Sequence, residues 1–319
     1  MNSKNYIIWT LTDGSEGMIS QVIGLAQELS NDIVQIKTDL LFPWSKLQPG
    51  IIPSFKWIFK NHIPKSIHPN IIISCGRKSV YLSTYLKNKN KNIINIHIQN
   101  PKISFKKFNY IITPNHDGVE GKNVINSTGA LHKFSPSILS SIKNTFEVSV
   151  KNLVTCILGG QNQHYVFNQS QVEDFCDKIN NLKKNNPEIN LLVITSRRTN
   201  SFIKKIITQK LNSIAKLWLG KGENPYAFAL KYSSNFIITS DSTSMISESA
   251  ISGKPIYIYQ LPFKRVSKRF EKFHNEFNQL NITKDFSNDI ILSNWSYSPL
   301  YESKRIAGII NERIVRENK

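Results

Sequence analysis

The stretch FIITSDSTSMISESAISGKPIYIY (residues 236–259) contains a strand, a helix and a second strand, and this succession decides the fold class. Its first five residues form an apolar, β-branched run, which is typical of a strand buried in a parallel sheet. Asp241 or Ser242 can cap the helix that follows, and Gly253 before Pro255 ends it. A second apolar run begins at Pro255, so the stretch predicts two parallel strands joined by a helix.

The same alternation of apolar runs and helical patterns extends over the whole chain. The predicted strands are 6–11, 33–37, 71–75, 93–98 and 110–113, followed by 153–160, 191–196, 216–220, 236–240 and 255–261. The predicted helices are 15–30, 76–89, 168–184, 200–212, 224–232, 243–252, 265–280 and 298–316. Between the two groups of strands, residues 132–152 lack a strand pattern and are rich in Ser and Lys, so we expect a linker in their later part.

The chain has 319 residues, which is long for a single core and indicates two domains. We predict an N-terminal Rossmann-like domain at 1–145 and a C-terminal Rossmann-like domain at 146–297, with the closing helix (298–319) packing back on the first. The fold class is therefore α/β, with two parallel sheets facing across a cleft. In such folds ligands bind at the carboxyl ends of the strands.

The formal charge of +19 arises from 41 Lys and Arg against 22 Asp and Glu. It favours anionic partners such as nucleotide phosphates or an anionic membrane. We do not expect nucleic-acid binding, because no block of five or six like charges and no nucleic-acid motif is present. The three cysteines are scattered and no HExxH or other metal-ligand spacing occurs, so we expect reduced thiols, no metal and no cofactor. With no run of ~20 apolar residues and no recognisable leader, the predicted location is the cytoplasm, with peripheral contact at the inner membrane as an option.

Polar clusters follow the predicted strands of the second half. The turn LGGQNQHY (158–165) combines close backbone approach with amides that can hold a phosphate, and SRRT (196–199) offers two guanidinium groups. A plain tight turn, or one salt-bridged and one solvated arginine, explains the same residues without a ligand. The candidates here are Gly159, Gly160, Gln161, Ser196, Arg197 and Arg198.

Two further clusters complete the predicted donor site. In GENPY (222–226), Asn224 can cap a helix and Tyr226 can stack on a base, although capping alone explains the motif. The amides that begin the helix after Asp241 can bind an anion. Glu248 lies about two turns further along, on the face of Ser244, where a carboxylate can accept ribose hydroxyls or remain simply solvated. The candidates are Asn224, Tyr226, Asp241, Ser242, Ser244, Met245 and Glu248.

The first half supplies loops of the same kind. TDGSEG (12–17) resembles a phosphate loop but is neither GxGxxG nor a Walker motif, and CGRKS (75–79) places an arginine at another strand end. TPNHDG (113–118) contains a histidine and an aspartate that can act as acid and base, although a histidine in a turn is often structural. The acceptor-side candidates are Gly14, Ser15, Gly17, Gly76 and Arg77, and the catalytic candidates are Asp13, His116 and Asp117.

A segment at 42–69 mixes aromatic residues with lysines. Aromatic and lysine side chains together suit a membrane headgroup region. The alternative is a loop and helix that pack on the edge of the domain.

Together, the motifs TDGSEG, SCGRKS, TPNHDG, GGQNQHY, TSRRT, NPY and DSTSMISESAISGKP resemble those of the mitochondrial fission “elongated mitochondria” (ELM-type) family, in the same order. The resemblance spans nearly the whole chain. The family has bacterial and plant members and takes its name from a plant protein linked to organelle fission. The abundance of Ile, Asn and Lys is typical of an AT-rich genome, so we expect a bacterial member.

The family is in turn similar to GT-B glycosyltransferases and non-hydrolysing sugar-nucleotide epimerases. This resemblance implies that Glu248 holds the nucleotide ribose. It also implies that Gly159, Gly160 and Arg197 lie near the diphosphate and that Ser242 to Met245 lie near the sugar or phosphate. The loop from Asp13 to Gly17 would face the acceptor, with Asp13 as its activating base. GT-B enzymes generally use arginines and helix N-termini, without a bound metal, to stabilise the leaving diphosphate.

The prediction is a metal-independent GT-B-type glycosyltransferase that moves a sugar from a nucleotide-sugar to an envelope glycan or lipid. One alternative is an epimerase of nucleotide-sugars, which needs no acceptor. A second alternative is a non-catalytic interaction protein of the organelle or membrane fission type.

Overall fold

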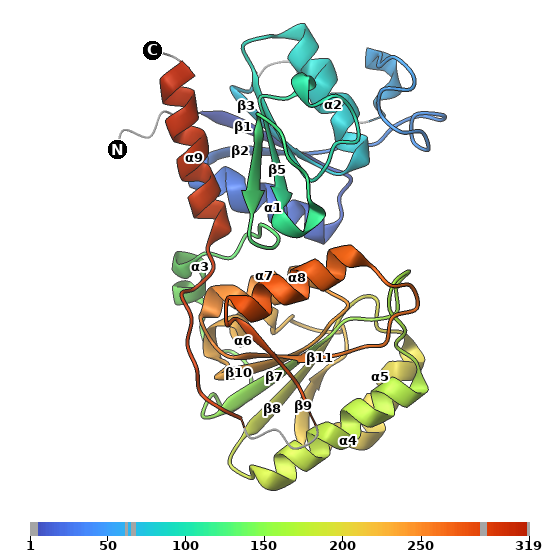
Figure 1. Ribbon diagram of the computed structural model, residues 1–319, viewed down its shortest axis with the longest axis vertical. Helices are drawn as coiled ribbons and strands as arrows, with labels where there is room; N and C mark the ends of the chain where they lie inside the picture. The colour runs from blue at the N-terminus through green and yellow to red at the C-terminus, as the bar shows by residue number, and fades with distance from the viewer. Residues whose placement is uncertain (1–5, 61–62, 65–67, 288–291, 318–319) are drawn as a thin grey trace. The chain divides into compact units, whose positions relative to one another are not determined.

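The computed structural model describes residues 6–60, 63–64, 68–287 and 292–317. Its contacts divide the chain into two compact units (Figure 1). Unit 1 comprises Met1–Lys133 and Tyr301–Lys319, and unit 2 comprises Phe134–Leu300. Each unit contains one six-stranded parallel sheet, so the predicted α/β class with two Rossmann-like sheets is confirmed.

Unit 1 is built on a sheet with the strand order β2-β1-β3-β4-β5-β6. Four of the five strands expected here are almost completely buried, as continuous apolar runs predict, whereas β2 is partly exposed. The sixth strand was not predicted, because VINS is short and half polar. The strands are β1 (Ile7–Thr12), β2 (Asp32–Lys37), β3 (Ile71–Cys75), β4 (Ile94–Ile98), β5 (Tyr110–Pro114) and β6 (Val124–Ser127).

The helices of unit 1 include the last helix of the chain, which packs along α1. Ile306, Ile310 and Ile314 of that helix lie in the same buried cluster as Val22 and Leu25 of α1. Figure 1 shows the helix, in red, beside the sheet of unit 1. The helices are α1 (Glu16–Leu29), α2 (Arg77–Lys89) and α9 (Glu302–Glu317), with short 3₁₀ turns η1 (Lys56–Ile58), η2 (Phe105–Lys107) and η3 (Asn115–Asp117).

Unit 2 is built on a sheet with the strand order β12-β11-β10-β7-β8-β9. The buried face of β7 contributes Val154, Cys156 and Leu158 to the cluster that joins α4 and α5 to the sheet. The short edge strand β12, with the sequence TKD, has no apolar run and was not predicted. The strands are β7 (Leu153–Leu158), β8 (Asn190–Thr195), β9 (Ala215–Trp218), β10 (Asn235–Thr239), β11 (Ile256–Tyr259) and β12 (Thr283–Asp285).

Unit 2 begins earlier than the boundary at 145/146 expected from the sequence. The reason is helix α3, whose carbonyls are held by α6. Lys231 Nζ donates to the carbonyls of Ser140 and Ile142, at 2.8 and 2.6 Å. The helices are α3 (Pro136–Ser141), α4 (Gln169–Asn185), α5 (Ser201–Leu211), α6 (Tyr226–Tyr232), α7 (Thr243–Ser249) with the 3₁₀ turn η4 (Ala250–Ser252), and α8 (Lys268–Gln279).

Each sheet has a switch point, where the chain begins to add strands on the other side of its first strand. In unit 1 this point lies between β1 and β3, and in unit 2 it lies between β7 and β10. Loops that leave the carboxyl ends of such neighbouring strands diverge and leave a crevice for ligands. The fold therefore directs attention to the loops after these four strands.

Candidate functional site

The Gly159–Gly160 turn after β7 packs directly against the loop after β10. Asp241, whose side chain is fully buried, accepts a hydrogen bond from the Gly160 amide at 3.1 Å and one from the Thr239 hydroxyl at 2.6 Å. The Gly159 amide donates to Thr239 Oγ1 at 2.8 Å. A Cβ on Gly159 would lie 2.2 Å from both Asp241 carboxylate oxygens, so only glycine fits. The sequence suggested that these amides are free for a phosphate, but in the structure both already have acceptors within the chain.

The two adjacent arginines after β8 have different environments. Arg198 Nη1 lies 2.7 Å from Asp241 Oδ2 and also donates to the Gly160 carbonyl at 3.3 Å. Arg197 is exposed and has no hydrogen-bond or ion-pair partner within the described part of the chain. Arg198 therefore fixes the glycine turn, while the guanidinium of Arg197 is available to an anion. Ser196 stabilises the arginine loop, since its hydroxyl accepts from the Arg198 amide at 3.1 Å.

Helix α7 begins after Ser242, whose hydroxyl accepts a long hydrogen bond (3.5 Å) from the Met245 amide. Of the two caps that the sequence allowed, Ser242 is the one used. Asp241 instead turns inward to the glycine turn. Ser244 and Met245 are half-buried in the first turn of the helix.

Glu248, further along α7, is half-buried and receives a hydrogen bond from Tyr226 of α6. The Tyr226 hydroxyl lies 2.7 Å from Glu248 Oε2. Burial, and after it the charge of Glu248, raises the pKa of Tyr226, so the hydroxyl keeps its proton and acts as the donor. The Tyr226 ring also packs against Phe134, with 5.8 Å between ring centroids. The Tyr226 hydroxyl, a neutral donor, thus orients the Glu248 carboxylate.

The remaining candidates of unit 2 lie in exposed loops. Asn224 accepts the Tyr226 amide at 3.0 Å, but the helix begins one residue later than expected, with Pro225 at the N-cap. Gln161 is exposed just beyond the glycine turn.

In unit 1, the loop after β1 forms a tight turn at the start of α1. Asp13 Oδ1 accepts the Ser15 amide at 3.0 Å, and Gly14 adopts a φ of +93°, which favours glycine. Gly17 has open space around it and lies in the first turn of the helix. A cavity of about 170 Å³ borders Gly14 and the ends of β1 and β2. This loop is therefore accessible, in contrast to the filled turn of unit 2.

The loop after β3 is close-packed, unlike the loop after β1. Gly76 has a φ of +87°, and a Cβ there would lie 2.4 Å from Met18 Sδ. The Arg77 guanidinium donates to the carbonyls of Trp44, Ser45 and Leu47. Arg77 was expected to face an acceptor, but the structure uses it to hold the chain at 44–47, an interaction that the sequence spacing did not indicate.

His116 and Asp117 lie together in η3, directly after β5. His116 is buried, and its Nε2 is 3.7 Å from Asp117 Oδ1, beyond hydrogen-bond distance. A buried imidazole is poorly placed to reach a substrate, whereas Asp13 is half-exposed. Asp117 is also partly exposed, so His116 is the buried one of the three predicted catalytic residues.

The sequence did not single out a buried histidine on β4. His97 Nδ1 lies 2.9 Å from Ser74 Oγ on the neighbouring strand β3, and burial lowers the pKa of His97 to about 3. The signal was present, because both polar residues interrupt apolar strands near their carboxyl ends. Their burial indicates a structural pair.

The described residues hold no group of three or more His, Cys, Asp or Glu side chains that could bind a metal ion. All three cysteines are free and buried. Among the described residues, no helix is long and apolar enough to cross a lipid bilayer.

A model of the family described as “Mitochondrial fission ELM1” matches residues 16–314. The chain belongs to this family. One relative, “Uncharacterized protein RP120” of Rickettsia prowazekii (strain Madrid E), is 28% identical over 95% of this chain and 97% of its own length. The “Mitochondrial fission protein ELM1” of Arabidopsis thaliana is 23% identical over 77% of this chain and 64% of its own length.

Solved structures show that this ELM1-family chain has a GT-B-like fold. A UDP-N-acetylglucosamine 2-epimerase superposes with a TM-score of 0.57 at 12% identity, covering 98% of this chain and 97% of the other. The UDP-GlcNAc 2-epimerase of Methanocaldococcus jannaschii, in complex with UDP-GlcNAc and UDP, gives 0.52 at 13% identity over 96% and 99%. A glycotransferase of kitacinnamycin gives 0.51 at 11% identity over 98% and 93%. These identities establish the fold alone.

Proposed function

We propose that this chain is a glycosyltransferase of the GT-B type, which binds a nucleotide-sugar in unit 2 and transfers the sugar to a glycan or lipid. The observation that carries the proposal is the Glu248 carboxylate on α7, fixed at 2.7 Å by the Tyr226 hydroxyl. A half-buried, oriented carboxylate on the helix that follows a strand end has the chemistry to accept hydrogen bonds from the hydroxyl groups of a ribose. The complexes of similar fold named with UDP-GlcNAc and UDP, from Methanocaldococcus jannaschii and S. aureus, support a nucleotide-sugar as ligand.

The arginine loop would supply the positive charge for the diphosphate. Arg197 is exposed and unpaired within the described residues, so its guanidinium can form a bidentate contact with phosphate oxygens. Arg198 and Asp241 would not contact the diphosphate themselves. Their contact at 2.7 Å holds the Gly159–Gly160 turn in place. The positive charge of Arg197 would stabilise the charge that develops when the nucleoside diphosphate leaves the sugar.

On the acceptor side, we propose Asp13 as the general base. Its carboxylate takes the proton of an acceptor hydroxyl as that oxygen bonds to the anomeric carbon and the diphosphate departs. Asp13 is half-exposed in the loop beside the 170 Å³ cavity, so a hydroxyl can approach it. His116 with Asp117 is the second choice because His116 is buried.

A second candidate function is epimerisation of a nucleotide-sugar. It is favoured by the number of structures named UDP-GlcNAc 2-epimerase that share this fold. An epimerase changes the donor without any acceptor, whereas a transferase releases the nucleoside diphosphate only as the sugar is passed on.

The test is thermal denaturation of the purified protein with millimolar nucleoside diphosphates and nucleotide-sugars. Binding to the native state raises the melting temperature by mass action. We expect one nucleotide to raise it in the wild type and in Glu188→Ala, but not in Glu248→Ala. Glu188 is an exposed carboxylate just before β8, at the amino ends of the strands and so away from the strand ends that carry the candidate site. No stabilisation of the wild type by any nucleotide would overturn the proposal and favour an interaction protein. A donor that changes in the absence of acceptor would favour the epimerase.

A further inference from the structure

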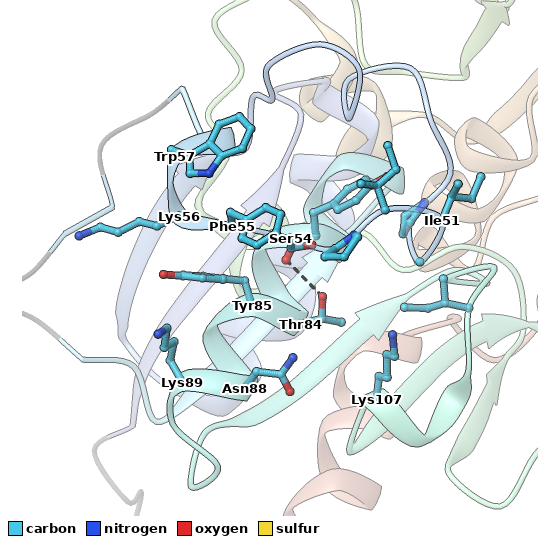
Figure 2. Close-up of a pocket in the computed structure, with 16 residues that line it drawn as sticks. Ile51, Ser54, Phe55, Lys56, Trp57, Thr84, Tyr85, Asn88, Lys89 and Lys107 are labelled. Carbon is cyan, nitrogen blue, oxygen red and sulfur yellow. Dashed lines mark hydrogen bonds between the residues drawn. The ribbon is translucent and has the colours of Figure 1, made fainter.

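Unit 1 contains a cavity of about 950 Å³ that has no place in the proposed reaction (Figure 2). Its walls are the loop 49–57, one face of α2 from Tyr81 to Lys89, and two residues of the loop before β5, Ile103 and Lys107. Helix α2 begins at the carboxyl end of β3 and runs toward the start of β4. The half of α2 that lines the cavity therefore lies away from the strand ends that carry the candidate site.

The loop beside this cavity exposes an unusual amount of apolar surface. Five of the eleven large hydrophobic side chains that are exposed in the described chain fall within residues 41–57. Phe42 is 79% exposed, Ile51 65% and Trp57 60%. The rings of Phe55 and Trp57 are stacked, with 5.9 Å between centroids and 5° between planes, and Trp44 supports Trp57 edge-on at 5.0 Å. Exposed apolar side chains gathered in this way mark a contact surface.

The charge around the cavity has one sign. Between Asp39 and Asp117 the sequence contains no aspartate and no glutamate, and every residue that lines the cavity falls within this stretch. Lys56, Lys89 and Lys107 line it and are exposed, and none is paired with a carboxylate of the described chain. The whole chain carries 22 acidic residues, so their absence from this stretch is a local feature and not a consequence of composition.

We propose that this aromatic–lysine surface, formed by Phe55, Trp57, Lys56, Lys89 and Lys107, docks on the surface of an anionic lipid bilayer. Aromatic rings lie at the level of the headgroups with their apolar parts toward the acyl chains, and lysines extend to the phosphates. An acidic protein partner would pair with the lysines but would not account for the exposed apolar side chains of Phe42, Ile51 and Trp57. Docking is independent of the proposed transferase activity and can hold where that proposal fails.

The experiment is co-sedimentation of the full chain with vesicles of phosphatidylglycerol and phosphatidylcholine, compared with vesicles of phosphatidylcholine alone. We expect binding only to the anionic vesicles and its loss at high salt. The triple variant Lys56→Gln, Lys89→Gln, Lys107→Gln should bind at least tenfold more weakly, since each lysine near an anionic surface contributes about fivefold in affinity. The matched control replaces three exposed lysines of unit 2, Lys184, Lys205 and Lys221, by Gln and should bind as the wild type does.

A second readout reports the aromatic contact without depending on charge. Lipids brominated near the headgroup should quench the fluorescence of the exposed Trp57, and Trp57→Phe should remove that quenching while it keeps an aromatic ring. No binding of the wild type to anionic vesicles, equal binding to neutral ones, or unchanged binding of the triple variant would each overturn the proposal. Quenching that persists in Trp57→Phe would also contradict it.

Discussion

The switch point of unit 2 is filled by side chains, whereas the equivalent loop of unit 1 borders an open cavity of about 170 Å³. In unit 2, the buried carboxylate of Asp241 joins the Gly160 amide, the Thr239 hydroxyl and the Arg198 guanidinium. In unit 1, the carboxylate of Asp13 is half-exposed and accepts a local hydrogen bond from the amide of Ser15. One topology thus gives a rigid loop in one unit and an accessible loop in the other. A buried, paired carboxylate is structural, while an accessible one is free for chemistry.

The largest expected difference between the two loops is the effect of a glycine-to-alanine substitution on the free energy of unfolding. Gly159→Ala places a Cβ 2.2 Å from both oxygens of Asp241, so the ion pair with Arg198 must break. We expect the free energy of unfolding of unit 2 to fall by roughly 3 kcal/mol or more. Gly17→Ala, which meets open space in the first turn of α1, should leave the stability of unit 1 unchanged or raise it by up to ~1 kcal/mol. Urea denaturation followed by circular dichroism measures both, and equal effects would remove the contrast between the loops.

The buried pair of His97 and Ser74 in unit 1 is neutral, so the stability of the fold should fall as the pH is lowered. The unfolded chain binds a proton at His97 below a pKa of ~6.5, while the folded chain does not until the pH approaches about 3. Stability that is present above pH 6.5 is therefore lost as the pH falls toward 3, by at most ~1.4 kcal/mol per pH unit from this group. His97→Asn should remove that part of the slope, and His68→Asn, at an exposed histidine, should not. Urea denaturation at pH 7, 6 and 5 measures the slope, and an unchanged slope in His97→Asn would contradict the assignment.

Within unit 2, substitutions of two tyrosines of α6 should distinguish an effect on nucleotide binding from an effect on stability. Tyr226→Phe removes the hydrogen bond to Glu248, and Tyr232→Phe removes the one to the Ile142 carbonyl, at 3.1 Å. Each should cost about 1 kcal/mol of stability. Only Tyr226→Phe should also weaken nucleotide binding, by up to about tenfold. Thermal denaturation with and without nucleotide checks both effects, and equal loss of binding in the two variants would show that Glu248 needs no fixed partner.

The sheets were predictable because their buried strands are continuous apolar runs with helical patterns between them. The two strands that escaped prediction, β6 and β12, are short and polar and owe their pairing to neighbours already in place. Unit 2 begins before the predicted boundary because α3, which has no strong sequence pattern of its own, is held in this unit by Lys231, far along the chain.

The positions of the candidate site were predictable from the strand ends, but the partners of its side chains were not. Asp241 and Arg198 come from different loops, and only the pairing of β10 with β7 and of β7 with β8 brings them together. Either arginine could have been the paired one on sequence grounds. For the same reason, the sequence did not reveal that Arg77 binds the carbonyls at 44–47.

The central claim is that the Glu248 carboxylate accepts hydrogen bonds from the ribose hydroxyl groups of a nucleotide. The most direct measurement is calorimetric titration of the wild type and Glu248→Ala with a ribonucleoside diphosphate and with its 2′-deoxy form. A hydrogen bond from the 2′-hydroxyl to a carboxylate predicts a preference of about tenfold or more for the ribose form in the wild type. That preference should disappear in Glu248→Ala. The same preference in both proteins would show that Glu248 does not contact the ribose.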